Sequence, residues 1–323
     1  MALLLNEKFF TKRVLKDGGD IKPLIIDSED TNGTAIFNPS IFNDDGKLLV
    51  NIRHCQYTFY HSRNFQHSDG PLVYLHPEDD RTLTTTNYLC ELDDKLDIKE
   101  CNRVDTSKLD VKPIWDFVGL EDGRVVRWDD KLYLTGVRRD TTTDGQGRME
   151  LSEIVDNKEV SRFRIPAIDL KSYCEKNWMP IIDMPYHYVK WTNPTEVVKV
   201  DPEKGTCEVV IQQPDALPTS RDLRGGSHVI PWEHGYLCVI HEVDAFSSMA
   251  GKKDGKYPHR FVSFDEDFKI NMLSNEFYFM GADVEFATGM CEYNGNFLIS
   301  FGFSDNAAFV LSCPKKSIMD IML

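Results

Sequence analysis

The sequence predicts an all-β fold, and three observations predict it. Short runs rich in Val, Ile, Phe and Tyr are separated by Asp-Asp, Asp-Gly, Asn-Gly or Glu-Lys-Gly turns, which is the pattern of successive β-strands. Helical periodicity is scarce, and only residues 167–174 and 315–323 resemble short helices. The strand pattern also recurs five times as a unit. Five units of roughly 60 residues are enough for four-stranded sheets packed around an axis, so we expect a five-bladed β-propeller with a central, funnel-shaped active site.

The five units follow one another along the chain, and each is a polar entrance, an apolar strand, a turn and a second apolar strand. They include residues 38–53, 119–138, 175–198, 224–242 and 285–305. Charged groups are unfavourable at the start of a buried strand unless they line a polar cavity. A β-sandwich is the alternative fold, but it gives no reason for this repeated placement. No linker-like stretch separates the units, so we expect residues 1–323 to form one domain, with a short N-terminal arm and a C-terminal tail closing the ring.

The second unit carries the most charge at its entrance. Glu121-Asp122-Gly123-Arg124 precedes an apolar run, and a tight turn leads to a second run that ends at Arg138. The turn and the two runs predict a β-hairpin. Taken alone, the charges would fit a solvated turn with a local ion pair, but the other four units repeat the layout.

Three insertions interrupt the units. Residues 56–80 are long and contain His61, His67 and several aromatic side chains, which predicts a functional loop at the rim. Residues 139–148 predict a polar turn or mobile loop, and residues 247–256 predict a flexible lid.

Composition narrows the class of protein. The 323 residues are 41% hydrophobic, no apolar run approaches a membrane span, and the N-terminus has no signal-peptide pattern. The eight cysteines are scattered without paired spacing, which favours free thiols over disulfides or a zinc site. The net charge of −15 disfavours extended wrapping of nucleic acid. We therefore expect a cytoplasmic protein without membrane association.

Several common catalytic motifs are absent. The sequence contains no nucleophile-elbow glycines, no glycine-rich phosphate loop and no histidine pair at helical spacing. This gives no support to serine hydrolase, P-loop or Rossmann functions, and we expect neither a bound metal nor a resident cofactor.

The order of short motifs at the unit entrances resembles the five-bladed propellers of the β-mannoside phosphorylases (glycoside hydrolase family 130) and their glycosyltransferase-like relatives. The resemblance extends from about residue 38 to residue 313 and rests on Glu121-Asp122-Gly123-Arg124, Glu175-Lys176-Asn177-Trp178, Arg224-Gly225-Gly226-Ser227, His259-Arg260-Phe261-Val262 and the run from Phe286 to Asp305. The Arg-Gly-Gly-Ser run fits propellers found beside or fused to glycosyltransferases better than it fits phosphorylases.

This resemblance implies a site for glycosyl transfer. The aspartate of the family's Glu-Asp-Pro-Arg motif donates a proton at the glycosidic bond, while arginine, lysine and histidine groups hold inorganic phosphate. Asp122 is therefore the candidate general acid and Arg124 a ligand for sugar or phosphate. Gly123 stands where the family usually has proline, which would stiffen the turn that aims the aspartate.

Elementary chemistry is compatible with this assignment. A buried carboxylic acid can protonate a leaving oxygen, and a neighbouring carboxylate such as Glu121 would raise the pKa of one of the pair. Inversion needs one protein carboxylate when phosphate or an acceptor hydroxyl attacks the opposite face. Trp178 and Tyr57 could provide a floor on which a sugar ring stacks.

The predicted site comprises Asp122 and Glu121 as catalytic residues and a larger set of polar, charged and aromatic residues as substrate ligands. Structural roles remain the alternatives: a turn or cap for Asp122, an ion pair and a core aromatic for Lys176 and Trp178, and hydrogen-bonded strand histidines. The predicted ligands are Asn38, Arg53, Arg124, Arg138, Glu175, Lys176, Asn177, Trp178, Arg224, Ser227, His228, His241, Glu242, His259, Arg260, Glu285 and Asp305.

The predicted function is inverting glycosyl transfer from a phosphate-bearing donor, either a sugar phosphate with inorganic phosphate or a nucleotide sugar. The acceptor would be a glycan or another hydroxyl compound, such as a hydroxylated nucleobase. One alternative is a glycoside hydrolase, which needs a second carboxylate from Glu175, Glu242, Glu285 or Asp305. The other alternative is a carbohydrate-binding propeller without catalysis.

Overall fold

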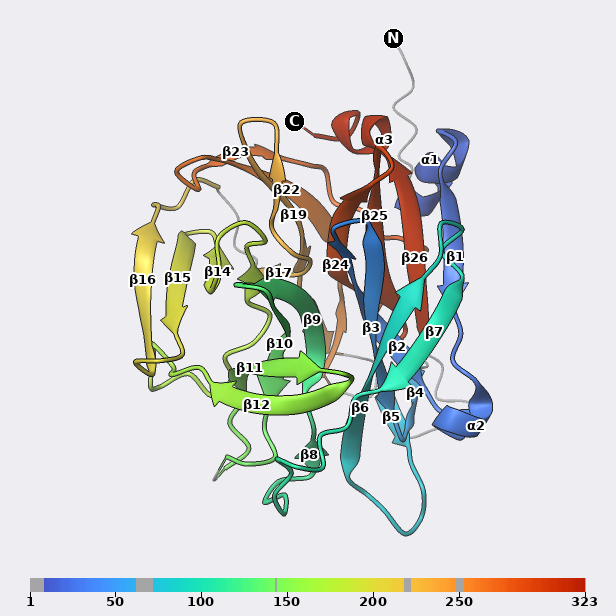
Figure 1. Ribbon diagram of the computed structural model, residues 1–323. Coiled ribbons are helices and arrows are strands. Elements are labelled where there is room, and N and C mark those ends of the chain that lie inside the picture. The colour runs from blue at the N-terminus through green and yellow to red at the C-terminus, as the bar shows by residue number, and fades with distance from the viewer. Residues whose placement is uncertain (1–8, 62–71, 143, 218–221, 248–252, 323) are drawn as a thin grey trace.

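The protein is a five-bladed β-propeller (Figure 1). The computed structural model describes residues 9–61, 72–142, 144–217, 222–247 and 253–322. Each of the five sequence units supplies the inner strands of one blade, so the all-β, five-bladed prediction is confirmed. Within each main sheet the neighbouring strands are antiparallel, apart from one short parallel strand at the edge of the first blade.

The first three blades follow directly along the chain. The first contains β2 (Ile36–Asp44), β3 (Lys47–Cys55), β6 (Leu83–Leu92) and β7 (Ile98–Arg103), with β8 (Phe117–Val118) parallel to β6. The second contains β9 (Glu121–Trp128), β10 (Lys131–Arg138), β11 (Arg148–Val155) and β12 (Lys158–Arg164). The third contains β13 (Met179–Pro180), β14 (His187–Thr192), β15 (Thr195–Asp201) and β16 (Thr206–Gln212).

The last two blades complete the ring. The fourth contains β17 (Leu223–Gly225), β18 (Ile230–Trp232), β19 (Gly235–Glu242), β22 (His259–Asp265) and β23 (Ile270–Leu273). The fifth contains β24 (Glu285–Tyr293), β25 (Asn296–Phe303) and β26 (Ala307–Pro314). Its outermost strand is β1 (Asp20–Leu24), which pairs antiparallel with β26 from Asp20 opposite Ser312 to Leu24 opposite Ala308. The fifth blade therefore joins both ends of the described chain.

Turn chemistry explains the regular hairpins. The turn between β9 and β10 places Asp129 and Asp130 at φ of 49° and 62°, and the turn between β24 and β25 places Asn294 and Gly295 at 48° and 81°. Two successive positive φ values match the right-handed twist of the flanking strands, and Asp, Asn and Gly adopt them most readily. The Asp-Asp and Asn-Gly signals of the sequence therefore fix the strand pairing in these blades.

Two of the predicted insertions contain hairpins. Strands β4 (Thr58–His61) and β5 (Leu72–Leu75) pair within the first insertion. In the last, β21 (Lys253–Lys256) pairs with β20 (Asp244–Ser247), which begins three residues before the predicted insertion. The side chain of His61, His67 and residues 248–252 lie outside the described residues. Roles of these segments as a rim loop and a lid remain predictions.

The helices are few and short. They are α1 (Phe10–Lys16), α2 (Ser28–Thr31) and α3 (Lys315–Met319), and α3 forms the first part of the helix predicted at 315–323. The helix predicted at 167–174 is wrong. The Asp169 side chain accepts a hydrogen bond from the Lys171 N–H (2.9 Å), and its carbonyl accepts one from the Ser172 N–H (3.1 Å), so local side-chain bonding produces turns instead.

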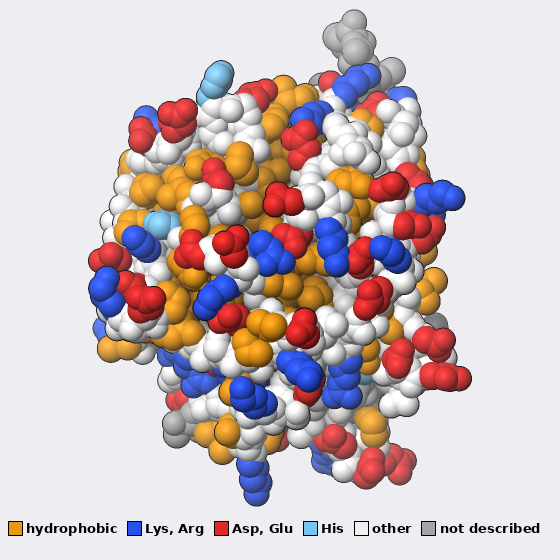
Figure 2. All heavy atoms as spheres, viewed as in Figure 1, with side chains coloured by type: hydrophobic (Ala, Val, Ile, Leu, Met, Phe, Trp, Pro, Cys, Tyr) orange, Lys and Arg blue, Asp and Glu red, His pale blue; other side chains and the backbone are white. Residues whose placement is uncertain are grey.

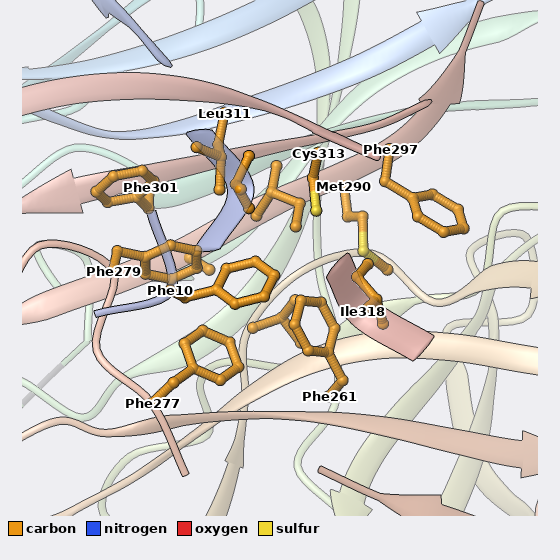
Figure 3. Packing of buried hydrophobic residues seen from close by; sticks show 14 of the residues in the cluster. Phe10, Phe261, Phe277, Phe279, Met290, Phe297, Phe301, Leu311, Cys313 and Ile318 are labelled. Carbon is orange, nitrogen blue, oxygen red and sulfur yellow. The ribbon is translucent and has the colours of Figure 1, made fainter. Parts of the chain in front are cut away.

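Helices α1 and α3 pack against side chains of the fourth and fifth blades. Phe10 of α1 is 2% exposed and packs against Phe261, Phe277 and Phe279, with Ile318 of α3 in the same cluster (Figure 3). Aromatic side chains dominate this cluster because each buries a large apolar area. The packing fixes α1 against the ring.

Buried polar side chains link the inner strands of different blades. His228 Nε2 donates to the Val125 carbonyl (2.7 Å), and its Nδ1 accepts from the Met290 N–H (3.3 Å). Ser40 Oγ accepts from the Val125 N–H (3.2 Å). Burial lowers the pKa of His228 to about 3, so the ring is neutral and can use one nitrogen as donor and the other as acceptor.

One cysteine pair corrects the expectation of free thiols. Cys90 and Cys101 lie directly opposite each other on β6 and β7 and form a disulfide. Their separation of 11 residues gave no recognisable spacing, and only strand register brings them together. The other six cysteines are free.

The described residues include no helix long and apolar enough to cross a membrane. On the face drawn in Figure 2, acidic and basic side chains are interspersed over exposed hydrophobic atoms. The net charge of −15 is therefore not gathered into one patch on this face.

Candidate active site at the ends of the inner strands

A polar cavity of about 300 Å³ lies where β2, β9 and β24 begin and where β3, β10, β19 and β25 end. All five blades contribute to it, directly or through the adjoining loops. Its lining residues are Asn38, Arg53, Tyr57, Tyr74, Phe117, Glu121, Asp122, Arg139, Lys176, Asn177, His241, Tyr257, Val284, Glu285, Phe286 and Asp305. The propeller thus brings together nine of the nineteen predicted site residues.

Asp122 occupies the start of β9 with a left-handed backbone (φ 52°). Its Oδ1 accepts a hydrogen bond from Asn38 Nδ2 (2.8 Å) and lies 2.9 Å from Arg53 Nη1. Arg124 Nη1 donates to the Asp122 carbonyl (3.2 Å). A strained backbone held by several partners is typical of functional positions.

Glu121 lies beside Asp122 and contacts two arginines. Its Oε2 is 3.4 Å from Arg53 Nη2, and its Oε1 is 3.7 Å from Arg139 Nε. Glu121 Oε1 and Arg139 Nε are both buried without a hydrogen-bond partner. Two carboxylates and two guanidinium groups therefore meet at one wall of the cavity.

The predicted rise in pKa for one carboxyl of the Glu121–Asp122 pair does not occur at Asp122. Burial raises the pKa of Asp122, but Arg53, the Asn38 amide, Lys176 and Arg124 together hold it below its ordinary value. Attraction to cations outweighs repulsion from Glu121 because Arg53 is in direct contact. Asp122 is consequently ionised at neutral pH.

Gly123 is fixed without the family proline. Its carbonyl accepts a hydrogen bond from Asn51 Nδ2 (2.8 Å), and the same amide donates to Asn87 Oδ1 (2.9 Å). A Cβ at Gly123 would lie 3.1 Å from Asn51 Nδ2. A buried amide pair from the first blade therefore positions the turn that carries Asp122.

Asp305 reaches the cavity from the fifth blade. It follows β25 in a turn where Ser304 and Asp305 have φ of 52° and 50°. It forms no hydrogen bond or ion pair with the described residues, although it is half-buried. Burial raises the pKa of Asp305 to about 6, with Arg53 and Lys176 opposing the rise and Asp122 and Glu121 adding to it.

Two further polar residues face the cavity from the third and fourth blades. Lys176 is exposed and forms no ion pair or hydrogen bond with the described residues. His241 is 3% exposed, and its Nδ1 has no hydrogen-bond partner. Burial and the neighbouring cations keep the pKa of His241 well below its ordinary value. Asn177 (φ 62°), like Asn38 (φ 46°) and Asp122, is a left-handed residue at an inner-strand entrance.

Several buried polar atoms at this cavity lack a hydrogen-bond partner. Asn38 Oδ1, Glu121 Oε1, Arg139 Nε and His241 Nδ1 are buried without a hydrogen-bond partner, and so is Arg124 Nη2 behind them. Buried polar groups are normally satisfied, and each exception needs a reason such as a bound ligand or water. The cavity is therefore suited to a polar ligand.

Arg124 does not line the cavity, contrary to prediction. It is 1% exposed, and its Nε donates to the Gly226 carbonyl (2.7 Å). Burial lowers the pKa of Arg124 to about 10. It supports Asp122 from behind by bonding two blades together.

Arg138 also faces away from the cavity. Its Nε donates to Glu150 Oε2 (2.8 Å), and its Nη1 lies 3.4 Å from Asp140 Oδ2. Glu150 also pairs with Arg164 at 2.9 Å. Successive strand residues point to opposite faces, which is why Arg139 reaches the cavity and Arg138 does not.

Of the four site residues predicted in the third blade, only Lys176 and Asn177 line the cavity. Trp178 is 1% exposed and packs with Tyr188 in the core, so it cannot stack on a ligand in the cavity. Its Nε1 donates to Glu175 Oε2 (3.2 Å), and Glu175 also lies 3.7 Å from Lys190 Nζ. Trp178 and Glu175 form a structural pair.

Four of the predicted ligands, which are two histidines, a serine and a glutamate, form hydrogen bonds within the protein. Ser227 Oγ donates to the His228 carbonyl (2.8 Å), and His259 Nε2 accepts from the Ala287 N–H (3.2 Å). His228 links three blades, as described above. Glu285 lines the cavity, but its carboxylate accepts four backbone N–H groups from residues 279–282.

The remaining predicted ligands of the fourth blade also lie outside the cavity. Glu242 is 2% exposed and bonds Arg260, whose Nη1 donates to the Ser274 carbonyl (2.8 Å). Arg224 pairs with Asp222 at 3.2 Å, near the surface.

Gly225 and Gly226 serve packing between strands. A Cβ at these positions would overlap the carbonyl oxygens of Asn177 and Val239, respectively. The absence of a side chain at these two positions therefore allows backbone to approach backbone closely.

Sequence reasoning missed several cavity residues. Tyr74, Phe117, Arg139 and Val284 come from strand ends or insertions where no motif marked them. Phe286 begins one of the motif runs but was not named as a ligand. Only Arg139 had a usable signal, since it follows Arg138 and must face the other way. Tyr57, predicted as a stacking group, does line the cavity, as does the unpredicted Tyr257.

Comparisons with known proteins agree with this architecture. A scan against protein-family models finds no match, and neither does a search of curated protein sequences. Solved structures do match. A β-1,2-mannobiose phosphorylase from Listeria innocua aligns with a TM-score of 0.53 and 13% identity, over 93% of this chain and 92% of that chain.

Two further matches have different activities. A GDP-Man-dependent mannosyltransferase from Leishmania mexicana has a TM-score of 0.55 and 11% identity, over 94% of this chain and 93% of that chain. A structure from the GH130 family of mannoside phosphorylases, which contains glycoside hydrolases that target β-1,2 mannosidic linkages, has a TM-score of 0.55 and 15% identity, over 87% and 85%. The chain is thus a five-bladed β-propeller with the fold shared by GH130 mannoside phosphorylases and a mannosyltransferase.

Proposed function

We propose that the protein is a carbohydrate-active enzyme that transfers a glycosyl unit, with inversion, from or to a phosphate group in the polar cavity. Proteins with the same fold include phosphorylases, a mannosyltransferase and hydrolases, which supports a sugar substrate without choosing the reaction. The donor would be a sugar phosphate or a nucleotide sugar, and the acceptor a glycan or other hydroxyl compound.

The observation that carries this proposal is the meeting of carboxylates and incompletely paired cations in one small cavity. Arg53 and Arg139 contact Glu121, while Lys176 has no partner among the described residues. Arginine and lysine are the usual ligands for phosphate. The unpaired amide oxygen of Asn38 offers an acceptor for a sugar hydroxyl.

Asp122 is the proposed acid/base residue. One of its oxygens is held by Asn38 and Arg53, which leaves the other available to a substrate. An anionic phosphate at Lys176 or Arg53 would offset the positive charge that keeps the pKa of Asp122 low. Binding of the donor would therefore make Asp122 a better proton acceptor when acid/base chemistry is needed.

A cavity of about 300 Å³ lies at the lower end of the range for small-molecule sites. This suits one sugar ring with a phosphate more readily than a complete nucleotide sugar. Among phosphate-bearing donors, the described cavity therefore favours a sugar 1-phosphate.

Activity with and without phosphate tests the proposal. Wild-type protein incubated with β-mannosides and inorganic phosphate should release a sugar 1-phosphate, and with the sugar 1-phosphate and an acceptor it should release phosphate. Asp122→Asn should reduce turnover by about 10²- to 10⁴-fold. It also breaks the buried pair with Arg53, so turnover is measured at a temperature at which the variant is folded. Arg127→Gln, which removes an arginine paired with Asp44 away from the cavity, is the control. Phosphate-independent release of free sugar would indicate a hydrolase, and binding without turnover a carbohydrate-binding protein.

A further inference from the structure

We propose that Asp305 is a second catalytic carboxyl of the same cavity, which exchanges a proton with the departing or attacking sugar oxygen while Asp122 exchanges one with the phosphate side. This inference rests on the proposed function. It adds a named residue and a division of roles to it.

Position is the first argument. Asp305 comes from the fifth blade and Asp122 from the second, and both line the same cavity. Glu175 and Glu242 do not line it, and Glu285 is occupied by four backbone N–H groups. Of the four carboxylates predicted as a second catalytic group, Asp305 is the one that can meet a ligand.

The second argument is the lack of internal partners. Asp122 is held by Arg53 and Asn38, whereas Asp305 has no hydrogen bond or ion pair with the described residues. A half-buried carboxyl without a partner is costly. A role towards a ligand accounts for its retention better than a structural role does.

The third argument is its backbone. Ser304 and Asp305, at φ of 52° and 50°, form the hairpin turn between β25 and β26, as Asp and Gly pairs do elsewhere in the ring. The turn is held on both sides, because the Ser304 N–H donates to the Val284 carbonyl (2.8 Å) and Asn306 exchanges two hydrogen bonds with the Phe59 backbone (2.6 and 3.1 Å). The turn therefore fixes the place at which Asp305 enters the cavity.

The electrostatic surroundings give the carboxyl groups of Asp122 and Asp305 different pKa values. The groups that interact with Asp305 are Arg53, Lys176, Asp122 and Glu121, and it interacts with Tyr57, Tyr74 and Tyr257. The pKa of Asp305 is raised to about 6, mainly by burial, whereas that of Asp122 is lowered. Two carboxyls whose environments separate their pKa values are the usual arrangement of an acid and a base.

The proposed step balances. In phosphorolysis, protonated Asp305 gives its proton to the bridging oxygen as the bond from that oxygen to the anomeric carbon breaks. A phosphate oxygen forms the new bond to the opposite face of that carbon. When hydrogen phosphate is the nucleophile, ionised Asp122 takes its proton. Solvent then returns both carboxyls to their starting states, and the reverse reaction uses the same groups in opposite roles.

Substrates with different leaving groups test Asp305. Asp305→Asn keeps a residue that tolerates the left-handed turn, so folding should be preserved. It should lower kcat/KM by about 10²-fold or more on an alkyl mannoside. On a nitrophenyl mannoside, whose leaving group needs no proton, the loss should be less than about tenfold. Ser304→Gly, which keeps the carboxyl and the turn, is the matched control and should behave as wild type.

The outcomes separate this inference from the proposed function. Equal losses of kcat/KM on both substrates would show that Asp305 only binds substrate. No loss on either would show that it takes no part in the reaction. Either result overturns the inference and leaves the proposed glycosyl transfer intact. If wild-type protein turns over no sugar, the proposed function fails. Carbon-13 NMR of labelled aspartate tests the protonation of Asp305 separately. A titration near pH 6 that is present in wild type and absent in Asp305→Asn would support the assignment. A titration that persists in the variant would overturn it.

Discussion

Arg53 at the end of β3 and Asp122 at the start of β9 form an ion pair of 2.9 Å between two blades. Both side chains are mostly buried, with 8% and 13% exposed. Breaking a buried pair leaves an uncompensated charge, which costs about 3–5 kcal/mol. The stability of the ring therefore depends on the charges of the side chains in its cavity.

Replacing Arg53 should make stability depend on pH in a specific direction. In wild type the low pKa of Asp122 contributes stability above the unfolded pKa, and this is lost as pH falls through the folded pKa. In Arg53→Met, burial raises the pKa of Asp122, so stability is lost as pH rises. The difference in unfolding free energy between the two proteins should grow from pH 4 to pH 7.

Denaturant titration at pH 4 and pH 7 measures this difference. Arg127→Met is the control, because Arg127 pairs with Asp44 at the half-exposed surface and should cost about 1 kcal/mol or less. A difference for Arg53→Met that is the same at both pH values would show that Asp122 is not the responsible group.

Gly302→Ala should impair activity through Asn38. A Cβ at Gly302 would overlap the Asn38 side-chain oxygen and press on its backbone, and Asn38 holds Asp122. We expect a loss of about 1–3 kcal/mol in stability together with a fall in kcat. Gly255→Ala, whose Cβ would meet no atom closer than 3.4 Å, should change neither. Unchanged kcat in Gly302→Ala at a temperature where it is folded would contradict this positioning role.

Lys176→Gln should weaken phosphate binding with little effect on folding. Lys176 is exposed to the cavity without a partner, and a hydrogen bond to a charged group contributes about 1.5–3 kcal/mol. Isothermal titration with inorganic phosphate should show affinity about 10- to 100-fold lower. Arg224→Gln, which removes a cation outside the cavity, should bind as wild type; equal weakening by both variants would indicate general electrostatics.

Glu150→Gln should destabilise the second blade. Glu150 is 1% exposed and pairs with Arg138 and Arg164, so the loss of its charge leaves buried arginines undercompensated, at about 3 kcal/mol. Glu153→Gln on the same strand removes a surface pair with Lys131 and should cost about 0.5 kcal/mol. KM for the sugar should be unchanged in both, because Arg138 does not reach the cavity.

The fold was predictable because local chemistry repeats. Pairs of Asp, Asn and Gly mark the hairpin turns, such as Asp129-Asp130, and β-branched runs mark the strands that flank them. The site was predictable only where a motif coincides with a strand entrance, as at Asp122 and Asn177. Which face a side chain takes depends on register and bulges, and so Arg138 and Trp178 were misplaced. Residues from insertions, such as Phe117, have no local signal for the cavity.

The pairing of β1 with β26 has a consequence for biosynthesis. Residues 20–24 are synthesised about 290 residues before their partners at 308–312. At the usual rate of about 5–20 residues per second, β1 waits roughly 15 to 60 seconds as an unpaired strand. During that interval the edge of the fifth blade is absent, and premature pairing with another nascent chain would yield joined copies. Chaperone dependence during synthesis is the expected cost of closing a ring between distant segments.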